Sequence, residues 1–415
     1  MPMDPYFEAQ LRQRRAQVVG GVRATVGAAL RSLPARLRGH SPARSAGEAL
    51  TLVHATGPAT RAAEAPPKPE APEAPAERAP LAEFSDATEL VPAPADSVRP
   101  ARTAPPRGTP EWERRNAWKW DIKLHGLVGI NGPVLPTREF LIPVPGYPAV
   151  RVRLYLPATP AAGPLPAVIA FFGGSFHLGG IDYASVDHAF RRRTADSGVA
   201  TLAVDYALAP DHRFPTPVEQ GYAALDWFFR HAAELGIDPT RIAINGTSSG
   251  GNIAAATTLL NRARRDHPLA LQVLEVPTTD LTGRHIDFWP LRRMGVPRPL
   301  AARELRKIRT RYLGDARLAR TDLASPLRSR NLRGLPPAFI LTAEYDALRG
   351  DGRDYADALR RAGVEASAVQ YQGATHEAAM YTAELPLARR WHADIVTILR
   401  TLHGDSAAAD TLPRD

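Results

Sequence analysis

The stretch NGTSSGGN, residues 245–252, decides the fold. It contains the Gly-x-Ser-x-Gly pattern of a nucleophile elbow, centred on Ser248. An apolar, β-branched run at residues 241–244 precedes the pattern, and a run of helix formers at residues 253–260 follows it. Strand, glycine turn and helix form the setting in which this motif presents a serine hydroxyl, because glycine lets neighbouring backbones approach closely. The helix N-terminus also favours developing negative charge. The stretch therefore predicts a nucleophile at Ser248.

Short apolar segments alternate with helical patterns on both sides of this motif. Buried strands that alternate with helices predict an α/β fold with a mostly parallel sheet covered on both faces. Catalytic groups in such sheets collect beyond the carboxyl ends of the strands. Residues 140–142 and 150–156 flank PGYP and predict a hairpin before this series. The candidate strands are 167–172, 199–204, 242–244, 271–276, 338–342 and 368–371, with helical patterns near 183–197, 217–235, 250–265, 350–362 and 385–402.

The bulk composition excludes several classes of protein. The 415 residues carry a formal net charge of +9 and include no cysteine, which excludes disulfides, thiolate catalysis and Cys-ligated zinc. No run of Lys and Arg interleaves with aromatic residues, so we interpret the charge as scattered and expect no nucleic-acid partner. No apolar run reaches the roughly 20 residues of a membrane-spanning helix, and no secretory signal pattern is visible. We expect a cytoplasmic protein.

The N-terminal third differs from the rest of the chain. Residues 1–50 are basic, and apolar residues from Leu11 to Leu37 recur at helical spacing. Such an amphipathic helix packs on its own catalytic domain, or contacts a membrane surface or a partner protein through residues 1–40. Residues 51–108 are rich in Pro and Ala and lack a periodic apolar face, which predicts a disordered linker. The catalytic domain is expected over 109–403, with cap elements at 109–135 and 280–320, and residues 404–415 as a tail.

A serine nucleophile needs a base that takes its proton and an acid that orients the base. The best candidate base is His376, in a loop after the last predicted strand. The acid is expected after the penultimate strand, and Asp346 is the best choice there. Glu344 and Asp351 are the alternatives, although Glu344 lies close to the strand and Asp351 already lies in the next helix. The resulting order of serine, acid and histidine is that of the α/β-hydrolase arrangement.

An oxyanion hole of backbone N–H groups would complete such a site. The segment FGGSFHLGG, residues 172–180, follows the first strand of the series. It can supply the N–H groups of Gly173, Gly174 and Ser175, and the N–H of Ser249 would complete the hole. Ser175 carries a Cβ where a glycine is usual, so a positive φ at this position would strain the loop.

Together these motifs resemble the hormone-sensitive-lipase family of α/β-hydrolases over roughly residues 135–402. GTSSGGN at 246–252 is similar to the family's Gly-Asp-Ser-Ala-Gly-Gly-Asn, and VDYALAPDH at 204–212 is similar to its Val-Asp-Tyr-Arg-Leu-Ala-Pro-Glu-His. FGGS at 172–175 stands where the family has His-Gly-Gly-Gly, so a phenylalanine replaces a histidine that helps to fix the oxyanion loop. The resemblance implies a carboxylester hydrolase with a helical cap and no metal or organic cofactor.

The sequence thus predicts a serine carboxylesterase that hydrolyses a small-to-medium acyl ester through an acyl-serine. Two alternatives remain open: acyl transfer to an acceptor other than water, and a ligand-binding protein that keeps the fold without the chemistry. The segment HEAAM, residues 376–380, begins like a zinc-protease helix. Met380 stands where that motif requires its second histidine, so we expect no metal site.

Overall fold

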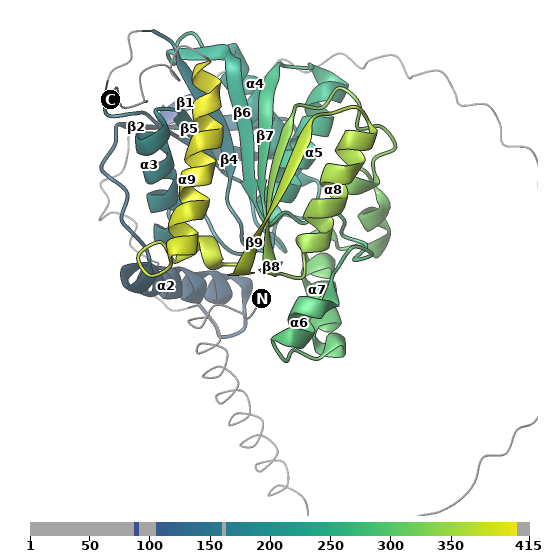
Figure 1. The fold of residues 1–415 in the computed structure, drawn as a ribbon. Coiled ribbons are helices and arrows are strands. Elements are labelled where there is room, and N and C mark those ends of the chain that lie inside the picture. Colours follow the sequence, from purple (N-terminus) through teal and green to yellow (C-terminus); the bar gives the residue numbers. More distant parts are fainter. Residues whose placement is uncertain (1–86, 91–104, 160–162, 405–415) are drawn as a thin grey trace, which may run out of the picture. The chain divides into compact units, whose positions relative to one another are not determined.

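The computed structural model describes residues 87–90, 105–159 and 163–404 (Figure 1). The predicted helix of residues 1–50, most of the predicted linker and nearly all of the predicted tail lie outside these ranges. The remainder of the chain forms an α/β unit, as the alternation of strands and helices predicted.

The described strands join in one sheet in the order β1-β2-β3-β5-β4-β6-β7-β8-β9. All neighbours from β5 to β9 in this order are parallel, whereas β1, β2 and β3 pair antiparallel at one edge. The predicted hairpin and the predicted mostly parallel sheet are confirmed. The strands are β1 (Thr88–Leu90), β2 (Thr137–Val144), β3 (Tyr147–Tyr155), β4 (Leu165–Phe171), β5 (Ala200–Asp205), β6 (Ile237–Thr247), β7 (Leu269–Glu275), β8 (Ala338–Tyr345) and β9 (Ala366–Thr375).

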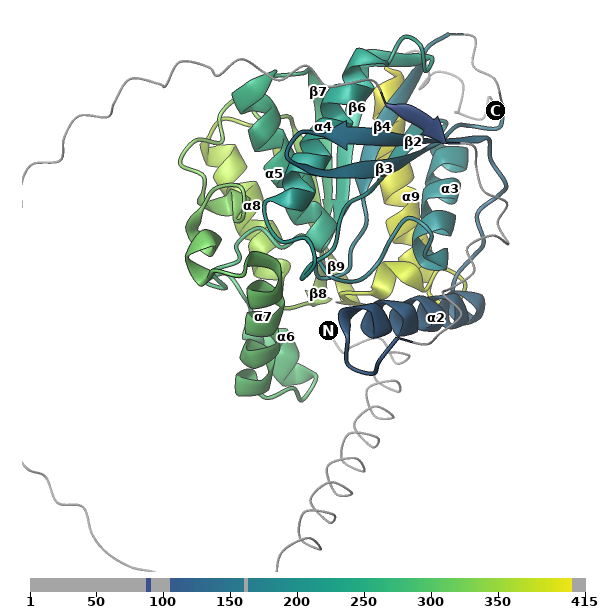
Figure 2. The same cartoon turned by 180° about the vertical axis from the view of Figure 1, so that it is seen from behind.

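Helices cover both faces of the sheet (Figures 1 and 2). Successive strand residues point to opposite faces, so neighbours in one strand enter different cores. Val168 packs in one core with Trp391 of α9, whereas Ile169 packs in the other core with Ile253 of α5. The helices are α2 (Pro110–Val128), α3 (Ala184–Ser197), α4 (Thr216–Arg230), α5 (Ser249–Arg264), α6 (Phe288–Arg293), α7 (Arg298–Leu313), α8 (Arg349–Arg361) and α9 (Pro386–Arg400).

Strand β1 corrects the linker prediction at three residues. It lies inside the stretch 51–108 that was predicted to be disordered, yet it pairs antiparallel with β2 in the register Glu89 to Phe140. Arg138 also donates two hydrogen bonds to the Glu89 carboxylate, at 2.7 and 2.9 Å. A three-residue strand is too short to show alternation, and its partner lies far along the chain, so no local pattern predicts it.

Three helices stand at one end of the sheet. Figure 1 shows α2, α6 and α7 at the end where β8 and β9 finish. Helix α2 lies within the first predicted cap segment, and α6 and α7 lie within the second. Since the parallel strands end here, these helices surround the place where the candidate residues meet. No helix among the described residues is long and apolar enough to cross a bilayer.

Candidate active site

The turn from β6 to α5 forces Ser248 into a strained conformation, with φ 55° and ψ −115°. A Cβ on Gly246 would lie 2.2 Å from the carbonyl oxygen of Gly250, and a Cβ on Gly250 would lie 2.3 Å from that of Phe171. Both distances are far below van der Waals contact, so only glycine fits at these two positions. The local sequence therefore builds a tight elbow that holds the serine at the carboxyl edge of the sheet.

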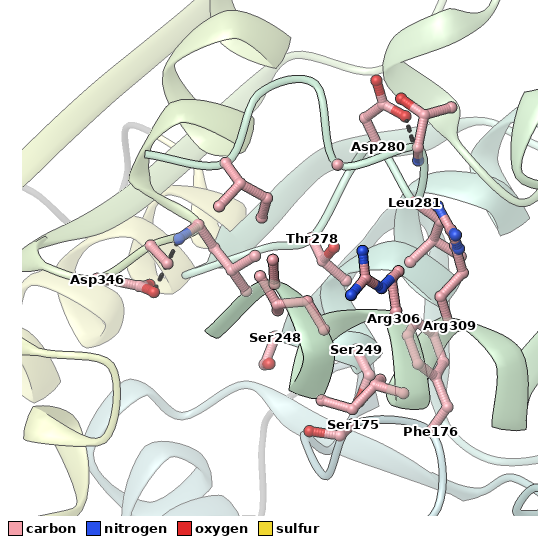
Figure 3. A pocket seen from close by; sticks show the side chains of 18 of the residues that line it. Ser175, Phe176, Ser248, Ser249, Thr278, Asp280, Leu281, Arg306, Arg309 and Asp346 are labelled. Atoms are coloured by element: carbon pink, nitrogen blue, oxygen red, sulfur yellow. Dashed lines mark hydrogen bonds between the residues drawn. The ribbon is translucent and has the colours of Figure 1, made fainter. Parts of the chain in front are cut away.

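The three predicted triad residues lie in one hydrogen-bonded chain. His376 Nε2 is 2.9 Å from Ser248 Oγ, and His376 Nδ1 is 2.8 Å from Asp346 Oδ2. Asp346 is buried in the turn after β8, and its other oxygen accepts a hydrogen bond from the N–H of Leu348 at 2.9 Å. Figure 3 shows Ser248 and Asp346 lining the same pocket. The imidazole is thus positioned between a hydroxyl and a carboxylate.

The two alternative acids bind backbone groups of β9 and of the loop after β7. Glu344 accepts a hydrogen bond from the N–H of Gly373 at 2.7 Å. Asp351 Oδ2 accepts from the N–H groups of Thr279 and Asp280 at 2.8 and 3.0 Å. Burial raises the pKa of Asp351 to about 7, although these backbone hydrogen bonds oppose the shift. Glu344 therefore ties β8 to the end of β9, and Asp351 ties α8 to the loop after β7.

The environment of His376 changes its basicity. Burial disfavours the charged imidazolium, but the adjacent Asp346 carboxylate outweighs burial and raises the pKa of His376 to about 9. Only the neutral imidazole can accept a proton from Ser248. The fraction of His376 able to act as a base therefore increases with pH and reaches one half near pH 9.

The loop after β4 carries two further residues with positive φ. Ser175 has φ 53° and Phe176 has φ 64°, so the strain predicted for a positive φ at Ser175 is present. The carbonyl oxygen of Gly174 accepts from the N–H groups of His177 and Leu178 at 3.1 and 2.9 Å, which closes a tight turn. A Cβ on Gly174 would lie 1.9 Å from the carbonyl oxygen of Leu178, so this position also needs glycine.

The N–H of Gly174, predicted to face the oxyanion, has a partner in the protein. It donates to Ser249 Oγ at 3.1 Å. The acceptor is the side-chain hydroxyl of the residue that directly follows the nucleophile. This side chain is buried. Of the other predicted donors, Ser175 and Ser249 line one cavity with Ser248, and Gly173 lines a second cavity that also reaches Ser248.

A buried tyrosine links this hydroxyl to the oxyanion loop. Tyr206 Oη lies 3.4 Å from Ser249 Oγ and donates to the carbonyl oxygen of Phe172 at 2.8 Å. The Tyr206 and Phe172 rings stack with centroids 4.2 Å apart. Phe172 is therefore held through its ring and its carbonyl group. No sequence pattern predicted a role for the side chains of Tyr206 and Ser249, although Tyr206 lies in the motif VDYALAPDH at 204–212.

Glu275 is buried beside the elbow, and no sequence motif indicated a role for it. The backbone carbonyl of Glu275 accepts from the N–H of Ser248 at 2.8 Å. Its side chain accepts two hydrogen bonds from Arg193, at 2.7 and 2.8 Å, and one from Trp391 Nε1 at 2.8 Å. Burial alone would raise the pKa of Glu275, but Arg193 outweighs burial and lowers it. An ionised carboxylate thus anchors the end of β7 beside the nucleophile.

Two cavities meet at Ser248, Ser175 and His376. One, of about 420 Å³, extends towards α7 and the loop 278–286, and the other, of about 390 Å³, extends towards α2. An ester with its carbonyl carbon at Ser248 can therefore place its acyl part in one cavity and its alcohol part in the other. Within the ranges that the structure describes, no group of three or more His, Asp or Glu side chains could hold a metal ion.

Comparisons with known proteins show the family to which this chain belongs. A family model described as alpha/beta hydrolase fold matches residues 168–380. Carboxylesterase NlhH of Mycobacterium tuberculosis is 37% identical over 240 residues, which cover 56% of this chain and 72% of that protein. The arylesterase of Saccharolobus solfataricus is 35% identical over 249 residues, which cover 59% and 77%.

Solved structures give the same result. The carboxylesterase EstE1 from a metagenomic library has a TM-score of 0.65 and 35% identity, covering 71% of this chain and 98% of that chain. The hyperthermophilic esterase of Pyrobaculum calidifontis has a TM-score of 0.64 and 32% identity, covering 71% and 94%. The chain belongs to the hormone-sensitive-lipase-like family of α/β-hydrolases, as its motifs predicted.

Proposed function

We propose that this chain is a serine carboxylesterase that hydrolyses small-to-medium acyl esters through an acyl-serine at Ser248. The observation that carries the proposal is the position of His376, with one ring nitrogen 2.9 Å from Ser248 Oγ and the other 2.8 Å from Asp346 Oδ2. The relatives named carboxylesterase and arylesterase support the same reaction class.

The geometry supports a two-step mechanism. Ser248 Oγ attacks the ester carbonyl while His376 Nε2 takes its proton, and Asp346 orients the ring and stabilises the imidazolium. The N–H groups of Ser175 and Ser249 bind the oxyanion, and the bond from Gly174 to Ser249 Oγ holds the loop beside them. The imidazolium then protonates the leaving alcohol. A water molecule, deprotonated by His376, attacks the acyl-serine and releases the acid.

Removal of the nucleophile gives the most direct test. Ser248→Ala is expected to lower kcat for p-nitrophenyl esters by about 10⁴-fold or more, because the covalent route is lost. A fluorophosphonate is expected to label the wild-type protein and not the variant, and circular dichroism checks that both are folded. A wild-type protein with neither turnover nor labelling would be a binding protein. Ester formation with an added alcohol, in place of free acid, would indicate acyl transfer.

The pH profile tests the pair of Asp346 and His376. Because the pKa of His376 is raised to about 9, kcat/KM is expected to increase with pH, with an inflection near pH 9 and a plateau above it. Asp346→Asn removes the charge that raises this pKa, so the inflection should move to lower pH. The plateau should fall by about 10²- to 10⁴-fold because the imidazole is no longer oriented and stabilised. An unchanged inflection would assign the acid role to another carboxylate.

A further inference from the structure

The cavity of about 420 Å³ is lined by residues whose buried polar atoms lack hydrogen-bond partners. Among the described residues, no hydrogen bond reaches Arg309 Nε, Thr282 Oγ or Asp280 Oδ2, although all three atoms are buried. The three residues line the same cavity as Ser248. A buried polar group without a partner costs free energy, so a cluster of such groups in a cavity indicates that a polar ligand group belongs there.

The charge at this place is positive. Arg306 and Arg309 both line the cavity and stand three positions apart, on one side of α7. Within the described ranges neither forms an ion pair, whereas Arg311 in the same helix pairs with Glu113 at 2.7 Å. Figure 3 shows Arg306 and Arg309 on the side of the pocket where Leu281 lies, with Asp346 on the opposite side.

The acidic residue in this part of the cavity, Asp280, lies near an arginine outside α7. Asp280 Oδ2 lies 3.8 Å from Arg328 Nη1, which compensates its charge, and 3.6 Å from His285 Nε2. The segment 284–313 carries nine Lys and Arg residues against two Asp and Glu residues. Its field favours the approach of anions to the cavity.

The wall between the nucleophile and the arginines is mostly apolar. A ligand that fits must therefore have an ester group at Ser248, a short apolar chain and an anionic group at Arg309. A planar guanidinium matches a carboxylate with two parallel hydrogen bonds. The apolar lining residues are Leu281, Ile286, Phe288, Leu305, Ile308 and Leu348.

We propose that the preferred substrates are small esters that carry a carboxylate, and that Arg309, assisted by Arg306, binds this carboxylate at the far end of the cavity. This inference rests on the proposed esterase function. The carboxylate belongs either to the acyl part, as in a monoester of a dicarboxylic acid, or to the alcohol part.

The experiment compares charged and neutral esters of the same shape with the full-length protein. In the acyl arm, mono-p-nitrophenyl glutarate is compared with p-nitrophenyl 4-carbamoylbutanoate. In the alcohol arm, 4-carboxyphenyl acetate is compared with 4-carbamoylphenyl acetate. We expect kcat/KM to favour the carboxylate by about tenfold or more in one arm, the size of one charge-assisted hydrogen bond. Equal values in both arms would overturn the inference and leave the esterase intact, whereas no turnover of any ester would refute the esterase itself.

Substitutions on α7 assign the effect to one side chain. Arg309→Met keeps most of the apolar stem and is expected to reduce the carboxylate-to-carbamoyl ratio of kcat/KM by about ten- to a hundredfold. Arg303→Met is the matched control, because Arg303 is exposed on the same helix and does not line the cavity. It removes the same charge and should leave the ratio within about twofold. An unchanged ratio in Arg309→Met, or an equal fall in Arg303→Met, would overturn the assignment.

A second variant covers the case in which Arg309→Met does not fold. Arg306→Met lies on an exposed position of the same cavity wall and is expected to lower the ratio by about threefold to tenfold. Thermal melting of all three variants separates loss of folding from loss of recognition. A ratio that stays at the wild-type value in Arg306→Met would contradict the assisting role of Arg306.

Discussion

The nucleophile elbow and the oxyanion loop face each other across the site, and different forces hold them. Both contain residues with positive φ: Ser248 at 55° in the elbow, and Ser175 at 53° and Phe176 at 64° in the loop. The elbow is held by backbone packing around two glycines: a Cβ on Gly246 would overlap the carbonyl of Gly250 in the same turn, and a Cβ on Gly250 would overlap that of Phe171 in β4. The loop has a comparable glycine at 174, and it depends in addition on hydrogen bonds with the side chains of Ser249 and Tyr206. The same kind of backbone strain is therefore enforced by backbone packing in the elbow, and by backbone packing together with side-chain hydrogen bonds in the loop.

The elbow cannot change Gly246 without opening its own turn, or Gly250 without moving β4. The oxyanion loop is anchored in part by side chains. Here Phe172 stacks on Tyr206, and Tyr206 donates to the carbonyl oxygen of Phe172. The N–H of Gly174 donates a hydrogen bond to Ser249 Oγ. A set of neutral hydrogen bonds and one ring stack thus anchors a loop that lacks a histidine at its first position.

The largest effect is expected from an elbow glycine. Gly250→Ala places a Cβ 2.3 Å from the carbonyl oxygen of Phe171, so β4 or the elbow must shift. We expect a loss of at least about 3 kcal/mol of unfolding free energy and at least about a hundredfold in kcat. Calorimetry and fluorophosphonate labelling measure the two effects. Gly126→Ala is the control, since a Cβ there meets nothing within 4 Å; a Gly250→Ala enzyme that matched it would disprove that backbone packing around Gly250 enforces the elbow.

An intermediate effect is expected from the hydroxyl that anchors the loop. Ser249→Ala removes the acceptor of the Gly174 N–H, so the loop should lose order in the transition state. We expect kcat to fall about tenfold with KM nearly unchanged, and the unfolding free energy to change by less than about 1.5 kcal/mol.

Tyr206→Phe provides the companion variant, because it removes the hydrogen bond to the carbonyl of Phe172. Its effect on kcat should be of similar size, and the double variant with Ser249→Ala should be less than additive, since both act on one loop. A faster Ser249→Ala enzyme would mean that the hydroxyl withholds the Gly174 N–H from the oxyanion.

The smallest effect is expected from the strained loop residue. Ser175→Gly removes the Cβ at φ 53°, which should stabilise the protein by up to about 1 kcal/mol, partly offset by the greater freedom of glycine in the unfolded chain. Ser367→Gly, at an exposed position of β9, is the control and should destabilise by about 0.5–1 kcal/mol. Urea titration measures both, and equal destabilisation by the two substitutions would show that Ser175 is not strained.

Much of the fold and of the site could be predicted from local patterns. The elbow needs small residues at fixed spacing, and buried strands alternate with helices at fixed periods, so both leave a direct trace in the sequence. The positions of Ser248 and His376 follow from the rule that catalytic groups collect after parallel strands. Strand β1 left no such trace, because its stability comes from pairing with β2 rather than from its own three residues.

The sequence by itself determined the sheet, the elbow and the short segment 344–351 in which the catalytic acid was expected. These features depend on steric limits and periodicities between near neighbours. The sequence favoured Asp346 over Glu344 and Asp351 by its place in the turn, and the tertiary structure brings its carboxylate to 2.8 Å from His376 Nδ1, whereas the other two bind backbone groups elsewhere. The link from Tyr206 to Ser249, and the unpaired Arg309 in the cavity, were likewise decided by packing. Contacts between distant residues depend on how strands and helices are placed against one another, and no local pattern records that placement.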